Sequence, residues 1–473
     1  MKSSHLIPAR EFTKVALLAG CFLLSAIFPA RSQTKTWNPT GSDDGNGTWN
    51  TTAKDWNTSQ KWTNGDDALF SGTGGTVTVD NIGADSLTFG ASGPYVLQSG
   101  TITMLENSVT VNSVATISSA ISVFGNLYLS GNGSLTLTGA SYVAPQGEFD
   151  FDSNLATVNI SGGATINDEY GTVGDQVSNG GMVTVSGNGS TWASTDGFIV
   201  GAYGAGAVQI TNGGAVSAPS VDIGQSGTGT LVITNGGALT SPYGAIIGEN
   251  ENTELAASGS VTVSGTGSTW NGGQNSSDEI EVGEGGQYPG NGLLRITNGG
   301  LVATGQVTVG TSGTFAFGQN AMLNSQLVAV GGLIEGSGSG SQLTVSGNVT
   351  LNNATMVIYI DAASNAADSL DITGGSDLTL IGDDMLTVDL INGTQLDQSS
   401  YVLATVPGGA IDGDFTNWDI PAGYAIDYDQ GATSQLLLVA VIPEPGGIGL
   451  ILTSIGIFST LAASRRLRSQ IVA

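Results

Sequence analysis

The chain has 473 residues, of which 73 are glycine and 12 are proline. Charged residues make up 11% of it, against roughly 25% in ordinary globular proteins. Because 40% of the residues are hydrophobic and glycine does not recur at every third position, neither a disordered acidic tail nor a triple helix fits. The 39 acidic residues outnumber the 11 basic ones, which gives a formal net charge of −28. This charge disfavours nucleic acid as a partner, since phosphate backbones are bound by basic surfaces.

The first segment, residues 1–32, has the pattern of a secretory signal peptide. Three basic residues precede an uncharged run over residues 15–28, and Ala30 and Ser32 then supply small side chains for signal cleavage. Cleavage after Ser32 would remove the single histidine and the single cysteine, Cys21. The sequence before Cys21 also resembles the lipobox of bacterial lipoproteins, in which the cysteine is lipidated, and this alternative remains open.

The last segment, residues 443–473, combines a proline motif, an uncharged stretch and a basic cluster. Pro443, Glu444 and Pro445 come first, an uncharged stretch covers residues 446–464, and Arg465 and Arg466 follow it. The length of this stretch is close to the ~20 residues that a transmembrane helix requires, and the arginines favour a cytoplasmic location for the far end. Since the basic residues near the N-terminus follow the same rule, the chain between the two hydrophobic segments is expected to be translocated.

This order of motif, helix and arginines resembles the PEP-CTERM sorting signal of Gram-negative bacteria, which is recognised by an exosortase. The resemblance implies transient anchoring in the membrane, processing near Pro443–Pro445 by an exosortase-type membrane protease, and delivery to the cell surface or extracellular matrix. Residues 469–473 extend beyond the arginines and depart from the pattern. A plain C-terminal membrane anchor is the alternative.

The exported body is more acidic than the whole chain. Seven basic and two acidic residues lie outside residues 34–443, so that 4 basic and 37 acidic residues remain inside and the net charge is about −33. Such a surface repels anionic polysaccharide, anionic lipid and DNA, but it favours solubility and divalent cations.

The middle of the chain contains internal repeats. The sequence VQITNGG at 208–214 recurs as LVITNGG at 231–237 and as LRITNGG at 294–300, and Val-Gly or Ile-Gly pairs alternate with these copies. Each copy alternates apolar with polar residues and is bounded by Asn and Gly, which predicts a short strand with one face inward. We therefore predict an all-β fold, a right-handed parallel β-helix (solenoid) with roughly 23 residues per coil, in which Asn212 and Asn235 stack at one corner.

Three parts of the body differ in composition: residues 33–80 are rich in tryptophan, 81–340 carry the repeats, and 341–442 contain less glycine. We expect first coils with an N-terminal cap, then β-helix repeats, then final coils with a C-terminal cap. Residues 37–79 and 417–424 are similar to the opening and closing segments of autotransporter-type β-helical passengers. An alternative for the first part is a carbohydrate-binding platform, formed by Trp37, Trp49, Trp56 and Trp62.

The body offers little catalytic chemistry. Without histidine or cysteine, no serine or threonine has an evident activating partner. The adjacent acids Asp66 and Asp67, like Asp383 and Asp384, should point to opposite faces of a strand, which does not suit glycoside hydrolysis. Residues 43–47 place hard oxygen donors in a turn and give calcium only a weak case, because the spacing of an EF-hand is absent.

We therefore expect no catalytic, cofactor or metal site in the body. The predicted function is that of an exported, non-enzymatic surface or matrix protein that serves adhesion, spacing or biofilm structure, with extracellular polysaccharide as a further candidate partner. The alternative is a secreted enzyme that binds or degrades polysaccharide on the same scaffold. Acidic side chains leaning together on neighbouring coils would favour the enzyme, and a uniform Thr, Ser and Asn surface would favour the structural protein.

Overall fold

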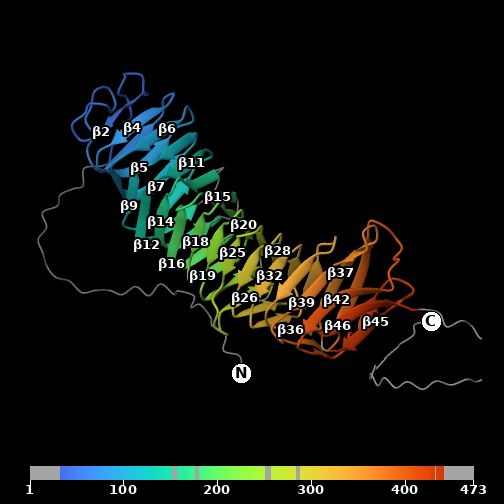
Figure 1. The fold of residues 1–473 in the computed structure, drawn as a ribbon. Coiled ribbons are helices and arrows are strands. Elements are labelled where there is room, and N and C mark those ends of the chain that lie inside the picture. Colours follow the sequence, from blue (N-terminus) through green and yellow to red (C-terminus); the bar gives the residue numbers. More distant parts are fainter. Residues whose placement is uncertain are drawn as a thin grey trace, which may run out of the picture.

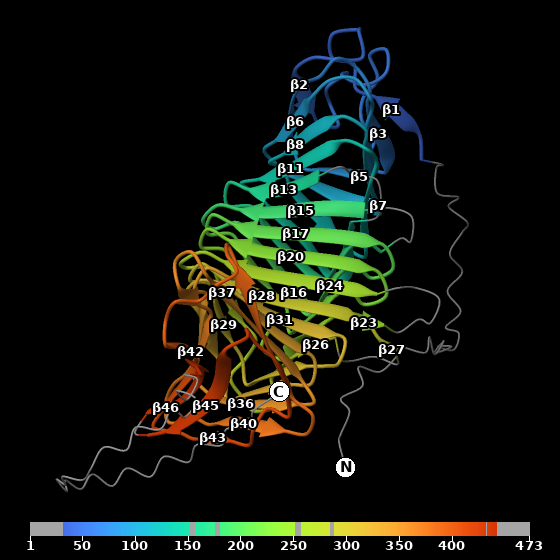
Figure 2. The same ribbon diagram turned by 90° about the vertical axis from the view of Figure 1, so that its right-hand side faces the viewer.

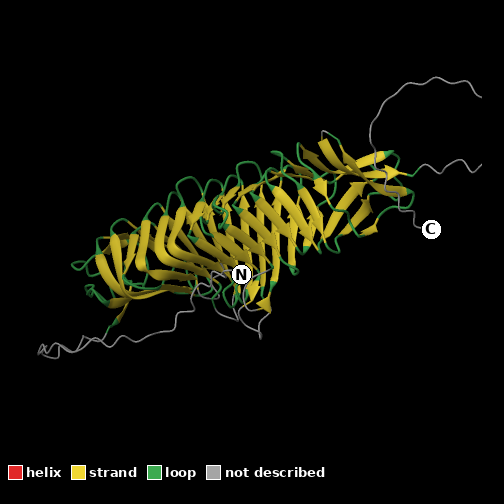
Figure 3. Ribbon diagram, turned by 90° about the horizontal axis from the view of Figure 1, so that it is seen from below, coloured by secondary structure: helices red, strands yellow, loops and turns green. Residues whose placement is uncertain are grey.

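The computed structural model describes residues 32–151, 157–175, 180–250, 257–283, 288–431 and 433–441. In these ranges the chain forms an elongated stack of strands (Figure 1), and strands and loops account for its whole length (Figure 3). Within the same ranges, no helix has the length and apolar character needed to cross a membrane. The expected transmembrane helix of the sorting signal and nearly all of the expected signal peptide lie outside the described residues.

The strands are short and follow one another closely. Those of the first half are β1 (Thr34–Thr36), β2 (Gly47–Trp49), β3 (Asp66–Phe70), β4 (Gly75–Val79), β5 (Ile82–Phe89), β6 (Tyr95–Gln98), β7 (Thr101–Val111), β8 (Val114–Ile117), β9 (Ala120–Val123), β10 (Leu127–Ser130), β11 (Ser134–Thr138), β12 (Ser141–Phe151), β13 (Thr157–Ser161), β14 (Thr165–Val173), β15 (Gly180–Ser186), β16 (Thr191–Val200), β17 (Ala205–Thr211), β18 (Ala215–Ser217), β19 (Ser220–Ile223), β20 (Thr228–Thr234), β21 (Ala238–Thr240) and β22 (Gly244–Ile247).

Those of the second half are β23 (Glu249–Asn250), β24 (Ser258–Ser264), β25 (Thr269–Asn271), β26 (Glu279–Val282), β27 (Tyr288–Pro289), β28 (Asn291–Thr297), β29 (Leu301–Ala303), β30 (Gln306–Val309), β31 (Gly313–Phe317), β32 (Ala321–Asn324), β33 (Leu327–Val330), β34 (Leu333–Gly336), β35 (Gln342–Val345), β36 (Asn348–Asn352), β37 (Thr355–Asp361), β38 (Ala366–Ala367), β39 (Ser369–Ile372), β40 (Leu378–Ile381), β41 (Met385–Ile391), β42 (Ser400–Pro407), β43 (Ile411–Asp412), β44 (Asn417–Asp419), β45 (Tyr424–Gln430) and β46 (Thr433–Ala440).

Successive strands of one coil belong to three faces, and each strand pairs in parallel with its equivalent in the next coil. β17 pairs with β20, β18 with β21 and β19 with β22. We name the three sets face A (β17 and its ladder), face B (β18) and face C (β19); in several earlier coils one long bent strand, such as β7 or β14, supplies faces B and C together. Figure 2 shows the face A strands from β6 to β24 side by side. This all-β arrangement of parallel strands is consistent with the predicted β-helix.

The register of the repeats agrees with the sequence prediction, but the step between coils is not constant. Val208 pairs with Leu231, which is the predicted step. Leu231 then pairs with Val261 across a longer step, whereas Phe315 pairs with Ile334 across a shorter one. The predicted step of roughly 23 residues therefore holds for some coils and not for others. Only the strand segments must keep their ladders in register, so that the connections between faces can differ in length.

The Asn-Gly-Gly corners of successive coils are linked by side-chain hydrogen bonds along the stack. Asn212 and Asn235 have φ angles of 53° and 50°, a left-handed conformation that asparagine tolerates better than most residues. The side-chain amide of Asn212 donates to the Ser186 hydroxyl (3.2 Å), and that of Asn235 donates to the Thr211 hydroxyl (3.3 Å). The asparagines thus bond to hydroxyls of the preceding coil and not to one another.

A glycine ladder on face A packs against the backbone of the Val-Gly and Ile-Gly pairs. Gly206, Gly229, Gly259, Gly292 and Gly313 pair in series on face A. A Cβ atom at Gly206 would lie 2.2 Å from the carbonyl oxygen of Val173, and one at Gly259 would lie 2.0 Å from that of Ile223. Both distances are shorter than a non-bonded contact allows, so that the chain can turn closely from face C into face A only at glycine.

The two ends of the stack are closed by different means. At the N-terminal end, the side chains of Trp37, Trp49, Trp56 and Trp62 are at most 2% exposed, and the rings of Trp56 and Trp62 lie 4.5 Å apart. Such burial leaves no ring face for a ligand, so that the alternative of a carbohydrate-binding platform on these rings is wrong. At the C-terminal end, β46 pairs in antiparallel fashion with both β42 and β45.

Candidate functional site

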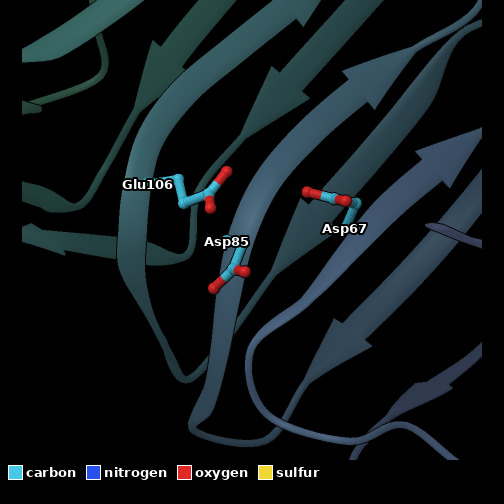
Figure 4. A group of neighbouring side chains, drawn as sticks. All are labelled: Asp67, Asp85 and Glu106. Carbon is cyan, nitrogen blue, oxygen red and sulfur yellow. The ribbon is translucent and has the colours of Figure 1, made fainter. Parts of the chain in front are cut away.

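Three carboxylates from successive coils meet at the corner between faces B and C (Figure 4). Asp67 lies on β3, Asp85 on β5 and Glu106 on β7, and one carboxylate oxygen from each lies within 4.8 Å of the others. The register of these strands shifts where the acids lie, between Ala84 and Ser86 for example. Because such bulges re-aim side chains, they account for acids that face one another across coils. We call this group the acidic trio.

Hydroxyl groups donate hydrogen bonds to one member of the acidic trio, Asp67. The Ser32 and Ser86 hydroxyls donate to the two carboxylate oxygens of Asp67, at 2.7 and 2.6 Å. Burial raises the pKa of Asp85 above its ordinary value, and the neighbouring charges of Asp67 and Asp66 raise it further. Lys35 does not relieve this repulsion directly, since its ammonium group lies 2.6 Å from Asp66. The acidic trio thus concentrates negative charge on the first coils.

The acidic trio provides hard oxygen ligands of the kind that calcium and magnesium prefer. It also satisfies the condition set above for an enzyme, because acids on neighbouring coils lean together. Sequence reasoning missed this group, since its members lie on different coils and no local motif joins them. The signal that could have found it is the spacing of the three acids along the chain, which is close to one coil in this part of the molecule.

Of the two adjacent acid pairs singled out from the sequence, only Asp67 belongs to the acidic trio. Asp66 is 7% exposed and pairs with Lys35, while its neighbour Asp67 belongs to the acidic trio. Asp383 is exposed, whereas Asp384 is fully buried and accepts hydrogen bonds from the backbone N–H groups of Ala354 and Ile381, both at 2.8 Å. Neither adjacent pair forms a catalytic pair.

The candidate calcium turn at residues 43–47 is held by its own hydrogen bonds. The Thr73 and Thr40 hydroxyls donate to the carboxylate of Asp44, at 2.5 and 3.0 Å, and lower its pKa. The Asn38 amide donates to Asp43 at 2.8 Å. Each carboxylate therefore already has a structural partner in the turn.

The outer side of face A carries mainly neutral polar residues. Thr116, Thr136, Asn159, Thr184 and Gln209 pair in series along one ladder of five coils. These five coils agree with the surface expected of a structural protein. Further along the stack, the same ladder continues through Val232 and Thr262 to Arg295 and Glu335, which are charged.

The sorting residues predicted from the sequence are not placed by the structure. Ala30, Pro443, Glu444, Pro445, Arg465 and Arg466 lie outside the described residues. Ser32 is described, and its hydroxyl is the one that bonds to Asp67.

Comparison with known proteins gives one distant relative that bears on function. No family model matches the chain. The chain is 28% identical over 216 residues to the adhesin BmaC autotransporter of Brucella suis biovar 1 (strain 1330). The similarity covers 39% of this chain and 6% of the adhesin, so that it is confined to a small part of the adhesin.

Proposed function

We propose that the protein is an exported, non-enzymatic surface or matrix protein with an adhesin-like role, built on a right-handed parallel β-helix. The observation that carries this proposal is the similarity to an autotransporter adhesin, in a chain whose described residues form a long stack of parallel strands. A rod of this kind holds one end of a molecule away from the other without the need for a catalytic centre. The neutral residues on five coils of the outer face A ladder, from Thr116 to Gln209, support this role.

A second candidate, an enzyme that acts on polysaccharide, is favoured by the acidic trio. Two carboxylates at short range are the usual catalytic groups of glycoside hydrolysis. Against it stand the hydrogen bonds that the Asp67 carboxylate already accepts from Ser32 and Ser86. Incubation of the protein with neutral and anionic polysaccharides distinguishes the two roles. Reducing sugar released by the wild type and lost on Asp85→Asn would establish the enzyme.

The proposed route to the surface uses both ends of the chain. The signal peptide at residues 1–32 directs export, and residues 443–473 act as a PEP-CTERM signal that holds the protein in the membrane until an exosortase-type protease removes the tail. Prolines on both sides of Glu444 support this proposal, because they keep the backbone extended, as a protease cleft requires. A plain anchor would have no need of them.

Localisation of the full-length chain in cells with and without the sorting protease tests this route. We expect the extracellular protein to lack the residues after the Pro443–Pro445 motif, as measured by its intact mass. Glu444→Ala should leave the protein uncut in the membrane, and replacement of Arg465 and Arg466 should disturb its arrest or processing. Recovery of an extracellular protein that extends through Ala473 would reject the sorting signal and leave a simple anchor.

A further inference from the structure

A second part of the corner between faces B and C carries exposed aromatic residues beside amide and carboxylate groups. Phe124, which follows β9, is 82% exposed, and Tyr128 on β10 is 46% exposed. Apolar rings exposed to this degree on one coil are unusual where the outer surface is otherwise polar. The next three coils add Gln146 on β12, Glu169 on β14 and Asp196 on β16. With Asn126, these residues form what we call the corner patch.

The geometry of the strands brings these residues together. Met104 pairs with Val123, Ala144 with Asp168, and Asp168 with Ser194. The residues that follow these positions leave the ladder at the same corner, so that they project from successive coils. An open surface hollow of about 480 Å³ is lined by Pro145, Gln146, Glu169, Thr195 and Asp196. Phe124 and Tyr128 lie outside this lining. Four coils span roughly 14 Å along the rod.

Hydrogen bonds hold Asn126, Tyr128 and Asp196 of the corner patch in place before any ligand arrives. The Asn126 amide donates to Tyr128 Oη and to Glu148 Oε2, each at 3.3 Å. Tyr170 donates its hydroxyl hydrogen to Asp196, and its ring lies across Gly197, where an added Cβ would come within 3.0 Å of it. A surface whose side chains are already fixed loses little conformational entropy on binding.

The chemistry of the corner patch selects its ligand. Exposed rings stack on flat apolar faces, while amide and carboxylate oxygens accept hydrogen bonds from hydroxyl groups. Glu169 and Asp196 repel anions, and the four basic residues of the body, Lys35, Lys54, Lys61 and Arg295, lie on other coils. Neutral sugars combine apolar ring faces with many hydroxyl groups. We propose that the corner patch binds a neutral polysaccharide along the rod axis, without cleaving it.

This inference deepens the proposed adhesin-like role, on which it rests, by naming the class of ligand. Affinity electrophoresis of the protein recovered from the cell surface tests it in gels that contain hydroxyethylcellulose, xyloglucan, mixed-linkage glucan or alginate. We expect at least one neutral polysaccharide to retard the wild type, and alginate not to retard it. The double variant Phe124→Ala, Gln146→Ala should bind at least about tenfold more weakly.

The matched control is Tyr243→Ala, which removes an aromatic side chain that is 75% exposed on a different coil and should bind as the wild type does. Equal binding by the double variant, retardation by alginate, or no retardation by any neutral polysaccharide would overturn the proposal. Sugar release that Glu169→Gln abolishes would also overturn it, in favour of catalysis. Immunolabelling of intact cells reports separately on the proposed function: a surface protein that binds no glycan refutes this inference alone.

Discussion

The two ends of the rod solve one problem by different physical means. At the N-terminal end, the first coil is covered by side chains, because Trp37, Trp49, Trp56 and Phe70 pack within about 6 Å of one another. At the C-terminal end, the last coil is covered by backbone, since β46 forms antiparallel ladders with β42 and β45. Both arrangements prevent an open parallel edge from pairing with another chain.

Because the two ends are closed differently, we expect single substitutions to affect their stability differently. A cluster of rings needs no register and depends on volume, so that the removal of one ring leaves a cavity. A hairpin depends on hydrogen bonds that several residues share, and it tolerates the loss of a single side chain better. β45 also carries Asp427 and Asp429, charges that discourage further strand addition.

The largest effect should come from the aromatic cluster. Trp56 is fully buried, and its ring centre lies 4.5 Å from that of Trp62 and 5.1 Å from that of Trp49. Trp56→Ala should therefore cost about 3–5 kcal/mol of local stability, measured as earlier proteolysis in residues 32–111 during denaturation. Trp418→Ala at the other end, where the ring is only partly buried, should cost less. Equal costs would remove the contrast between the two ends.

An acid between the ends should give the next largest effect. Asp168 is 1% exposed and accepts a hydrogen bond from Trp192 Nε1 at 2.7 Å. Burial raises its pKa to about 7 in the folded chain, and the charge of Glu148 adds to the shift. The protonated folded form is therefore favoured: its stabilisation is complete below about pH 4 and is lost as the pH rises to about 7.

The loss amounts to roughly 4 kcal/mol, and Asp168→Asn should abolish it, because the amide still accepts from Trp192 and carries no charge. Unfolding of wild type and variant between pH 4 and 8 measures the difference. The exposed Asp383→Asn provides the control. If stability depends on pH in the Asp168 variant as it does in the wild type, Asp168 is not the source of the pH dependence.

A smaller effect is expected in the C-terminal hairpin. The Tyr428 hydroxyl oxygen accepts a hydrogen bond from the backbone N–H of Phe415 at 2.8 Å, and burial raises the pKa of Tyr428 to about 12. Tyr428→Phe leaves this N–H group without its partner and should cost about 1–2 kcal/mol, measured by hydrogen exchange in β45 and β46. Tyr424→Phe removes an exposed bond to Gln398 and should be nearly neutral. A large loss of stability in both Tyr428→Phe and Tyr424→Phe would mean that the hairpin depends on side chains, as the N-terminal end does.

The smallest effect concerns the charge beside the N-terminal cap. The raised pKa of Asp85 means that its ionised form is disfavoured in the folded chain, so that stability falls as the pH rises above about 4. Asp85→Asn should raise the free energy of unfolding by less than about 1 kcal/mol at neutral pH, since solvent and salt screen the site. Thermal unfolding with calcium adds a second test, because a gain confined to the wild type would show that the acidic trio binds the cation. A lower stability of Asp85→Asn than of the wild type at neutral pH would contradict the inferred repulsion between Asp85 and its neighbouring carboxylates.

Sequence periodicity predicted the coil far better than it predicted the corners. The alternation in residues 208–214 and 231–237 was enough to place Val208 opposite Leu231, because inward side chains must repeat wherever a ladder is buried. The length of each connection could not be predicted, since the loops between faces take no part in the strand pairing and their length is not constrained by it. The left-handed Asn212 could be expected from its residue type, but its partner, Ser186, depends on the stacking of two coils.

The candidate sites show the same limit. Asp384 looked like half of an acidic pair, and only the structure shows that its carboxylate binds two backbone N–H groups. Asp67, Asp85 and Glu106 are far apart in the sequence and meet because bulges fall at the same corner. Groups assembled across coils have no local motif, so that they can be found only after the coil register is known.

The stacked coils have a mechanical consequence for a protein held at both ends. The ladder hydrogen bonds run along the rod, so that tension between its ends would load the coil interfaces in series. The coils differ in length, and each would release roughly 60–120 Å of chain on opening. The rod would then lengthen one coil at a time, and the force at its attachment point would drop after each opening.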